Sequence, residues 1–373
     1  MINIFEPNVD KASIKLLETV FESKWLGRGT YVTEFEMRLT EILKSDASKV
    51  HTIANCTDAI FGVFEILGIN SKKEVIVPSI SFPAVGSSII AAGLKPRIVD
   101  IDLNTGNIDL DCVAEVLSTD TAAIFVTHYG GVPVDIKGLR QLVGPDVYII
   151  EDAACALGTY INGIACGTQG DFGCWSFDAM KLLTCGEGGA IYVANADKMK
   201  HAKEYFYLGL PTQAKSGIDR QATETRWWEY QLNTAGRRSI FTNINAAIGL
   251  PQFDTLHASL KRREYIRKYY CEALDRVGAN YLRQADPAVT YSNYFFTIFS
   301  NQRDELASHL KTKNIYSSFR YYPLHLIDLF KSFAESCKAA TVFSNTALNI
   351  PIHQSLSDAD VEHIADVIKN FYK

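Results

Sequence analysis

The sequence predicts an α/β protein built on a largely parallel β-sheet, with a smaller α+β domain toward its C-terminal end. Short runs rich in Val and Ile alternate with amphipathic segments, and these runs are apolar throughout. Continuous apolar strands are typical of parallel sheets, because helices cover both faces of such sheets. The length of 373 residues also exceeds what one small core needs and leaves room for a second domain.

The first half of the chain carries this alternation. Apolar residues spaced three and four apart predict helices at 14–21 and 35–43. The elements predicted after them are strands at 74–78, 97–101, 122–127, 147–150 and 190–193, and helices at 57–68, 83–92, 109–118 and 136–143. Ligands of parallel sheets bind beyond the carboxyl ends of the strands, so the polar residues after each strand are the candidates for a site.

The chain from residue 205 onward has a different pattern. Residues 205–235 are irregular and aromatic, and we expect a loop or a connection between domains there. The elements predicted after it are helices at 246–250 and 254–274, a strand at 294–299, and helices at 303–313 and 358–372. We therefore expect a large α/β domain over 1–250 and a small α+β domain over 251–373.

Composition narrows the class of protein. A hydrophobic content of 47% and a charged content of 21% exclude a disordered or fibrous chain. A net charge of −5 without a Lys/Arg cluster offers nucleic acid no electrostatic attraction. No apolar run is long enough to span a bilayer, and the first residues do not resemble a secretory signal. We expect a cytoplasmic protein with neither a nucleic-acid partner nor a membrane partner.

The eight cysteines are scattered, and none forms a C-x-x-C pair. This spacing argues against a zinc site or a redox pair, so we expect no metal and mostly buried thiols. Cys155 and Cys185 are among those that fall within the segment that carries the reactive side chains.

Three segments carry candidate reactive groups. An apolar strand runs directly into Glu151 and Asp152, and Lys181 stands on a turn before the glycine-rich residues 186–189. Thr57 opens a predicted helix, where the backbone amides and the helix dipole attract an anion. A carboxylate, an amine and an anion site suit pyridoxal 5′-phosphate (PLP), which has a ring nitrogen, an aldehyde and a phosphate.

Each of these features also has a purely structural interpretation. Asp152 and Lys181 suit an ion pair at the end of a strand as well. Thr57 suits a helix N-cap, which is a more common role than phosphate binding. The glycines suit a simple turn, and residue spacing alone does not decide between these alternatives.

The longest motif resembles the cofactor segment of the DegT/DnrJ/EryC1/StrS family of PLP-dependent sugar aminotransferases. It reads EDAACALGTYINGIACGTQGDFGCWSFDAMKLLTCGEGGAIYV over residues 151–193. Further similar segments are PSISFPAVGSSIIAAGLKPRIVDID, TNINAAIGLPQF, FRYYPLHL and NIPIHQSLSDADV. The resemblance runs from about residue 25 to the C-terminus. It implies an aspartate-aminotransferase-like enzyme of fold type I, with a mostly parallel sheet of the seven-stranded type.

The resemblance also implies the roles of individual residues. Lys181 bonds to the aldehyde of PLP and then moves a proton, while Asp152 keeps the ring nitrogen protonated. We expect the site to lower the pKa of the Lys181 amine, partly by burial, because a protonated lysine cannot act as a base. The remaining implied cofactor contacts are Thr57, the backbone amide of Asp58 and Ser176 at the phosphate, and Phe82 stacked on the ring.

Two positions depart from the family pattern. Cys155 stands near the ring where the family usually has Gln or His, and a thiol is a poorer hydrogen-bond partner. Arg238 stands where the family usually has the Asn or Lys that reaches the phosphate of the neighbouring subunit, and a guanidinium suits that role. The resemblance therefore implies a homodimer with shared sites. The pair 237–238 also suits a solvated surface.

The implied reaction moves an amino group from L-glutamate to a keto sugar, with pyridoxamine 5′-phosphate (PMP) as the intermediate form of the cofactor. The implied substrate contacts are His325, Arg320, Tyr321, Tyr129 and Arg28. The first candidate for the acceptor is a nucleotide-linked keto-deoxy sugar for surface polysaccharide or lipopolysaccharide synthesis.

Alternative acceptors are a keto-sugar acid such as an oxo-octulosonate and a small phosphorylated ketone. The arginines of the sequence suit a diphosphate, a carboxylate or a single phosphate, and among them are Arg220, Arg226 and Arg237. A PMP-dependent sugar dehydratase and a non-catalytic binding protein of the same fold are further alternatives. Lys181 argues against the dehydratase branch, which has His at that position.

Overall fold

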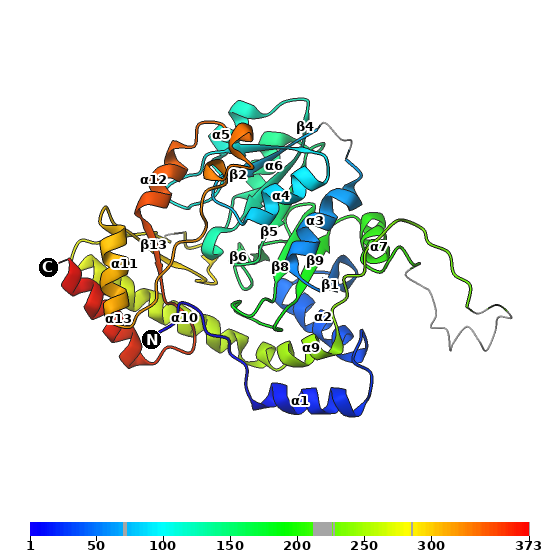
Figure 1. Ribbon diagram of the computed structural model, residues 1–373, viewed down its shortest axis with the longest axis horizontal. Helices are drawn as coiled ribbons and strands as arrows, with labels where there is room; N and C mark the ends of the chain where they lie inside the picture. Colours follow the sequence, from blue (N-terminus) through cyan, green and yellow to red (C-terminus); the bar gives the residue numbers. More distant parts are fainter. Residues whose placement is uncertain (70–72, 212–225, 227, 285, 373) are drawn as a thin grey trace.

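A seven-stranded sheet forms the centre of the molecule, in the order β1-β9-β8-β5-β4-β2-β3 (Figure 1). The computed structural model describes residues 1–373 apart from 70–72, 212–225, 227, 285 and 373. The strands of this sheet are β1 (Val50–Ile53), β2 (Glu74–Pro78), β3 (Lys95–Val99), β4 (Thr121–Thr127), β5 (Tyr148–Asp152), β8 (Phe172–Ser176) and β9 (Gly189–Val193). Strand β9 is antiparallel to both neighbours and the other pairs are parallel, which confirms the expected sheet.

Both faces of the sheet are buried, which explains why the predicted strands are apolar at every position. On β2, Val75 and Val77 enter one hydrophobic cluster and Ile76 enters another. On β5, Ile149 and Ile150 separate in the same way. Successive side chains of a strand point to opposite faces, so a strand covered on both sides needs an unbroken apolar run.

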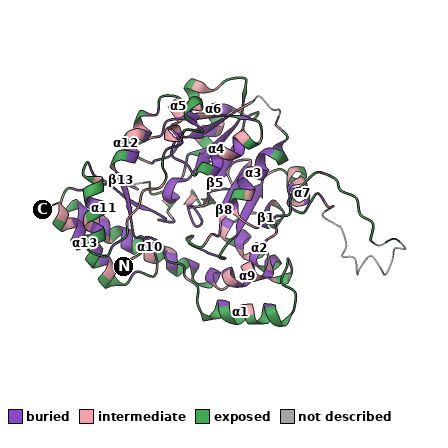
Figure 2. Ribbon diagram, in the orientation of Figure 1, coloured by how far each residue is buried: buried purple, intermediate pink, exposed green. Residues whose placement is uncertain are grey.

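Helices form a layer on each face of the sheet (Figure 1). One layer consists of α3 (Cys56–Leu67), α4 (Pro83–Ala91) and α7 (Ala196–Tyr205). The other consists of α2 (Thr30–Leu43), α5 (Leu110–Val116), α6 (Ile136–Val143) and α9 (Asn243–Gly249). Helix α1 (Lys11–Glu22) packs on α9 and leaves its outer side exposed (Figure 2).

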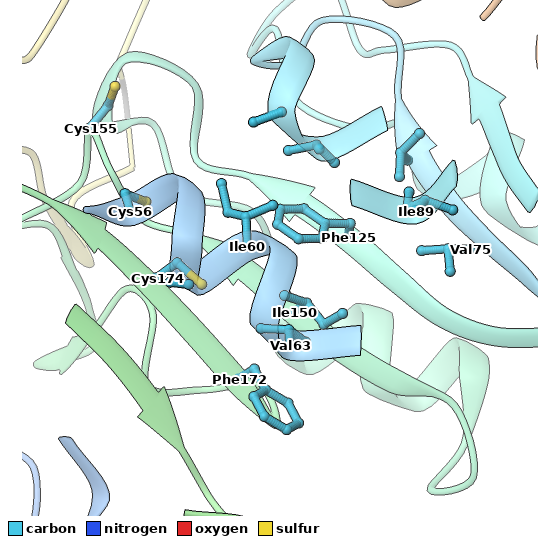
Figure 3. Close-up of a cluster of buried hydrophobic side chains, with 14 of the residues drawn as sticks. Cys56, Ile60, Val63, Val75, Ile89, Phe125, Ile150, Cys155, Phe172 and Cys174 are labelled. Carbon is cyan, nitrogen blue, oxygen red and sulfur yellow. The ribbon is translucent and has the colours of Figure 1, made fainter. Parts of the chain in front are cut away.

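Helix α3 is the element that brings an N-terminal turn to the edge of the sheet. The Asn55 side chain caps it by accepting a 2.8 Å hydrogen bond from the amide of Asp58, and Gly68 ends it with φ 63°. Its buried side packs Ile60 and Val63 against the sheet (Figure 3). Capping and packing together fix where this turn lies.

The C-terminal part has a sheet and a hydrophobic cluster of its own. Its elements are α10 (Gln252–Asp275), β10 (Asn280–Tyr281), β12 (Phe296–Phe299), α11 (Arg303–Thr312), α12 (Lys338–Thr346), β13 (Ala347–Ile350) and α13 (Asp358–Phe371). Strands β10, β12 and β13 form the sheet, and the cluster includes Ile266 and Ile364. Ile2 pairs with Ile315, so the N-terminal residues lie beside this part. The expected α+β character is therefore present, while the boundary at 250/251 stays a prediction.

Several elements differ from the predictions. The patterns did not reveal β1, β8, β13, α7 or α12, nor the short strands β6 (Tyr160–Ile161), β7 (Ile164–Ala165) and β11 (Val289–Thr290). The strand expected at 294–299 begins at Phe296, because the amides of Tyr294 and Phe295 bind the Gly130 carbonyl instead of a strand. Among the described residues, no helix is both long and apolar enough to cross a membrane.

Candidate active site

Parallel strands bring most of the predicted site residues to one edge of the sheet. Strands β1, β2, β4, β5 and β8 all run in the same direction, so their carboxyl ends share that edge. The residues that end or follow these strands are Thr57 after β1, Phe82 after β2, Asp152 at the end of β5, Ser176 at the end of β8, and Lys181 in the loop after it. This is the edge at which parallel sheets bind their ligands.

Asp152 is a buried carboxylate with little hydrogen bonding. The side chain is 4% exposed, and its Oδ1 accepts one hydrogen bond of 2.9 Å from the amide of Ala154. Burial raises the pKa of Asp152, while the Ala154 amide and the positive charge of Lys181 oppose this rise. A cation placed against this carboxylate would therefore be paired favourably.

Glu151 points away from Asp152, because neighbouring residues of a strand face opposite sides. Its two oxygens accept hydrogen bonds from the amides of Gly167, Gln169 and Gly170 at 2.6–2.8 Å. His128 accepts from the Val134 amide at Nδ1, so its Nε2 carries the proton that it donates to Glu151 at 2.9 Å. Glu151 therefore holds the loop 167–170 in place.

Acidic and aromatic side chains surround the amine of Lys181. Its Nζ is 3.7 Å from the Sγ of Cys155 and 5.0 Å from the ring centroid of Tyr294. Burial alone lowers the pKa of Lys181, but Cys155, Tyr294, Tyr321 and Asp152 outweigh it and raise this pKa well above the usual value. The expected lowering is wrong for the chain by itself, because these neighbours stabilise the charged amine.

The first turn of α3 offers an exposed hydroxyl. Thr57 is exposed, and its hydroxyl makes no hydrogen bond with the described residues. The amide of Asp58, expected to bind phosphate, donates to the Asn55 side chain in this structure. The Asp58 carboxylate instead accepts a 2.6 Å hydrogen bond from Ser239 and lies 3.5 Å from Arg237. These two contacts tie the segment 237–239 to α3.

These residues fit the three functional parts of PLP. Asp152 suits the ring nitrogen, and Lys181 suits the aldehyde. Thr57, with the first turn of α3, suits the phosphate, and Ser176 ends a strand beside it. The ring of Phe82 is 43% exposed and meets Tyr321 edge-on at 5.7 Å, so one aromatic face is available at this edge.

Comparison with known proteins identifies the family of the chain. Residues 7–369 match the DegT/DnrJ/EryC1/StrS aminotransferase family. The chain belongs to this family. Aminotransferases of the family depend on PLP, and the chain is accordingly a transaminase with the fold of the sugar aminotransferases.

Its relatives share nearly the full length. A dTDP-4-dehydro-2,3,6-trideoxy-D-glucose 4-aminotransferase of Saccharopolyspora spinosa is 33% identical, covering 98% of this chain and 95% of that protein. A GDP-perosamine synthase of Vibrio cholerae is 29% identical, covering 100% and 99%. The crystal structure of the aminotransferase TlmJ from Streptoalloteichus hindustanus is 35% identical, with a TM-score of 0.92 and coverage of 99% and 98%. The family therefore includes nucleotide-sugar aminotransferases.

Two predicted substrate contacts already have partners within the chain. Tyr129 is 1% exposed and packs its ring against Phe295 and Phe343, so it is part of the core. His325 lies 2.5 Å from Ser79 Oγ through Nδ1 and 3.0 Å from Thr341 Oγ1 through Nε2. Both of its ring nitrogens are thus used within the protein, and neither is left for a sugar.

The other predicted contacts lie in different surroundings. Arg28 is held by Glu36, with both carboxylate oxygens 2.8 Å from its Nη2, in a pocket with His51 and Thr52. Tyr321 lies at the site, with its hydroxyl 3.9 Å from the Sγ of Cys155. Arg320 lies nearby, with its Nη2 3.6 Å from the Sδ of Met180.

Arg238 does not contact the α3 turn of its own chain. Its guanidinium lies over the ring of Tyr207 at 5.6 Å, while the neighbouring Arg237 faces Asp58. Of the other arginines considered, Arg226 pairs with Glu229, and Arg220 lies outside the described residues.

Sequence patterns missed Tyr294 and Ser239 as parts of this site. Tyr294 covers the Lys181 amine and donates a 3.1 Å hydrogen bond to the Met180 carbonyl. It lies far along the chain from Lys181 and within an apolar run, so no local signal marks it.

Proposed function

We propose that this protein transfers an amino group from L-glutamate to a keto sugar carried on a nucleoside diphosphate, for surface polysaccharide or lipopolysaccharide synthesis. The observation that carries the proposal is the Lys181 amine beside Cys155, at the edge of the sheet where Asp152 ends β5. The nucleotide-sugar aminotransferases among the relatives support the class of acceptor.

Different residues are assigned to holding the cofactor and to moving the proton. Bound PLP supplies an aldehyde that takes up the amino group and a ring that accepts an electron pair. Asp152 would pair with the ring nitrogen and keep it protonated. Thr57 and Ser176 would hold the phosphate, and Phe82 would pack against the ring. Lys181 would supply the amine that bonds to the aldehyde and, once released, the base that moves a proton.

Lys181 can perform this step only as a neutral amine. Its raised pKa in the chain alone reflects the groups around it, and a cation paired with Asp152 removes part of that stabilisation. Cys155 contributes a polarisable group 3.7 Å from the amine but little hydrogen bonding.

We propose that the active unit is a homodimer with shared sites. The described residues on either side of 212–225 extend away from the body beside α7 (Figure 1). They expose Trp228, Tyr230 and Leu232 at 58%, 69% and 56%. Such apolar exposure favours burial against a second copy, and the same contact would offer Arg238 to the phosphate of the partner.

Absorption spectroscopy of the PLP-loaded protein tests the proposed reaction. Addition of L-glutamate should convert the spectrum of the lysine-bound cofactor into that of PMP, and the matching keto acceptor should restore it. Nucleotide-linked keto sugars, keto-sugar acids and phosphorylated ketones are compared as acceptors in single-turnover reactions.

Lys181→Ala is the matched control for that experiment. This variant should fold, bind the cofactor without a covalent bond and fail to transaminate, because no other amine reaches the aldehyde. Turnover by Lys181→Ala at saturating substrate would contradict the role of Lys181. Recovery of the spectrum with a non-nucleotide acceptor alone would contradict the proposed substrate class and leave the transaminase intact.

A further inference from the structure

A second pocket lies in the C-terminal part of the protein, between α10 and the segment 281–293. Its volume is 570 Å³. Its lining includes Arg267, Lys268, Tyr281, Arg283, Tyr291 and Asn293, and none of the active-site residues assigned above.

Arg267 is a buried cation without a carboxylate partner. It is 7% exposed, and its Nη2 donates a 2.6 Å hydrogen bond to the Leu282 carbonyl. No carboxylate of the described residues lies within 4.0 Å of its guanidinium. By contrast, Arg262 on the same helix pairs with Asp358 at 2.6 Å. A buried charge that lacks a counter-charge is costly, and an anion in the pocket would compensate for it.

Two further polar atoms of this lining lack partners. Asn293 is 3% exposed, and its Oδ1 is buried without a hydrogen bond. The Nε2 of Gln284, which also lines the pocket, is buried and unpaired as well. Both atoms are closed to solvent, so they lie behind the wall of the pocket rather than in its open space, and the Arg267 guanidinium is the group of this lining that calls for a ligand.

The other two cations of the lining already have carboxylate partners. Lys268 is paired with Glu264 at 2.6 Å, and Arg283 is paired with Asp275 at 3.1 Å. Arg267 lies over the ring of Phe296 at 5.2 Å and is the cation of the lining that has no carboxylate partner among the described residues.

We propose that this pocket binds a small organic anion through a carboxylate or phosphate group held by Arg267. Asn293, which lines the pocket, is followed in the chain by Tyr294, whose ring centroid lies 5.0 Å from the Lys181 amine.

Calorimetric titration of the PLP-loaded protein with inorganic phosphate and, separately, with succinate tests the proposal. Constant ionic strength in a chloride buffer removes unspecific salt effects. We expect saturable binding of at least one probe, with one site per chain. Binding of phosphate alone identifies a phosphate ligand, and binding of succinate alone identifies a carboxylate ligand. The absence of saturable binding by both would overturn the proposal.

Arg267→Met should weaken that binding about tenfold or more, because it removes a charged donor. Arg262→Met is the matched control on the same helix, and it should keep the wild-type affinity. Equal binding by Arg267→Met and wild type would place the anion elsewhere and overturn the proposal.

If Arg267→Met does not fold, Arg283→Gln replaces it, since Arg283 is an exposed residue at the rim of the pocket. Arg276→Gln, which is exposed and outside the pocket, is then the control. Binding weakened in Arg283→Gln and unchanged in Arg276→Gln supports the proposal, and unchanged binding in both overturns it.

Discussion

Asp152 and Glu151 are adjacent carboxylates with opposite functions. The Asp152 carboxylate, at the edge of the sheet, accepts a single hydrogen bond. The Glu151 carboxylate accepts hydrogen bonds from three backbone amides and from His128. The difference follows from the alternation of side chains along β5, which turns one residue to the site and the next to the loop 167–170. Adjacent acids on this strand should therefore respond differently to neutralisation.

Asp152→Asn should slow the glutamate half-reaction by about 100-fold or more, because an amide cannot keep the ring nitrogen protonated. Cofactor affinity should change much less, since the phosphate contacts remain. Stopped-flow absorption of the PLP-loaded variant measures the rate. A rate within a few fold of wild type would show that Asp152 is a structural partner.

Glu151→Gln tests the role of the adjacent carboxylate. It replaces a carboxylate that accepts from three backbone amides, so it should lower the free energy of unfolding by about 1–3 kcal/mol. Denaturation by urea measures this loss. Equal stability of Glu151→Gln and wild type would contradict the anchoring role of Glu151.

His353 should make stability depend on pH. Its Nε2 binds the Asn3 carbonyl at 3.2 Å, and its Nδ1 is buried without a partner. Burial, and then the charge of Arg263, lower the pKa of His353 to about 4, although Asp360 and the Asn3 carbonyl oppose this shift. The unfolded chain therefore binds the proton first, and stability present above about pH 6.5 is lost as the pH falls toward 4.

This loss amounts to about 2 kcal/mol between pH 7 and pH 5. Urea denaturation at both pH values measures it in wild type and in His353→Gln, whose amide can still donate to Asn3. The variant should lose less stability over this interval. An identical loss in both proteins would assign the pH dependence to other groups.

Individual roles could be predicted from the sequence only where a motif carries them. Lys181 and Asp152 belong to a long local pattern, and the structure places both at the expected edge. The contacts of Tyr129 with Asn349 and of His325 with Ser79 could not be predicted, because these partners come from distant parts of the chain. Such long-range contacts leave no spacing to detect.

At the level of elements, a strand could be predicted from the sequence where both of its faces are buried. Strands β2 and β5 were recognised because both faces are covered, and their runs are therefore apolar. Strand β8 was not, because it contains Gly173 where another segment approaches closely. A Cβ at Gly173 would lie 1.8 Å from the Gly167 carbonyl oxygen. Gly173 permits this close approach, and it also interrupts the apolar run by which a strand is recognised in the sequence.

The junction of β9 and α3 depends on a second glycine. A Cβ at Gly189 would lie 2.5 Å from backbone atoms of Asn55 and Cys56, which begin α3. Gly189→Ala should therefore displace the first turn of α3, weaken PLP binding about tenfold and lower the free energy of unfolding by about 1–3 kcal/mol. Equilibrium dialysis and urea denaturation measure these two effects.

Gly27→Ala serves as the control, since no atom lies within 4 Å of a Cβ at that position. It should keep wild-type affinity and stability. Normal PLP binding by Gly189→Ala would show that the phosphate does not depend on the position of the α3 turn.

At the scale of the whole molecule, Arg237 and Arg238 serve different active sites of the proposed dimer. Arg237 faces the α3 turn of its own chain through Asp58, whereas Arg238 lies over Tyr207 and does not contact that turn. The exposed aromatic residues Trp228 and Tyr230 lie just before this pair in the chain. The proposed dimer buries them and presents Arg238 to the partner.

Arg238→Glu should then weaken cofactor retention, because a carboxylate would face the phosphate. Mixing inactive Arg238→Glu with inactive Lys181→Ala gives the decisive measurement. In a mixed dimer with shared sites, one site carries both defects and the other carries neither, so activity should return in part. Arg237→Glu mixed with Lys181→Ala is the comparison. Because Arg237 serves its own chain, that mixed dimer carries one defect in each site and should stay impaired. Failure of the first mixture to recover, with subunit exchange verified by native mass spectrometry, would restrict Arg238 to its own chain or to no site.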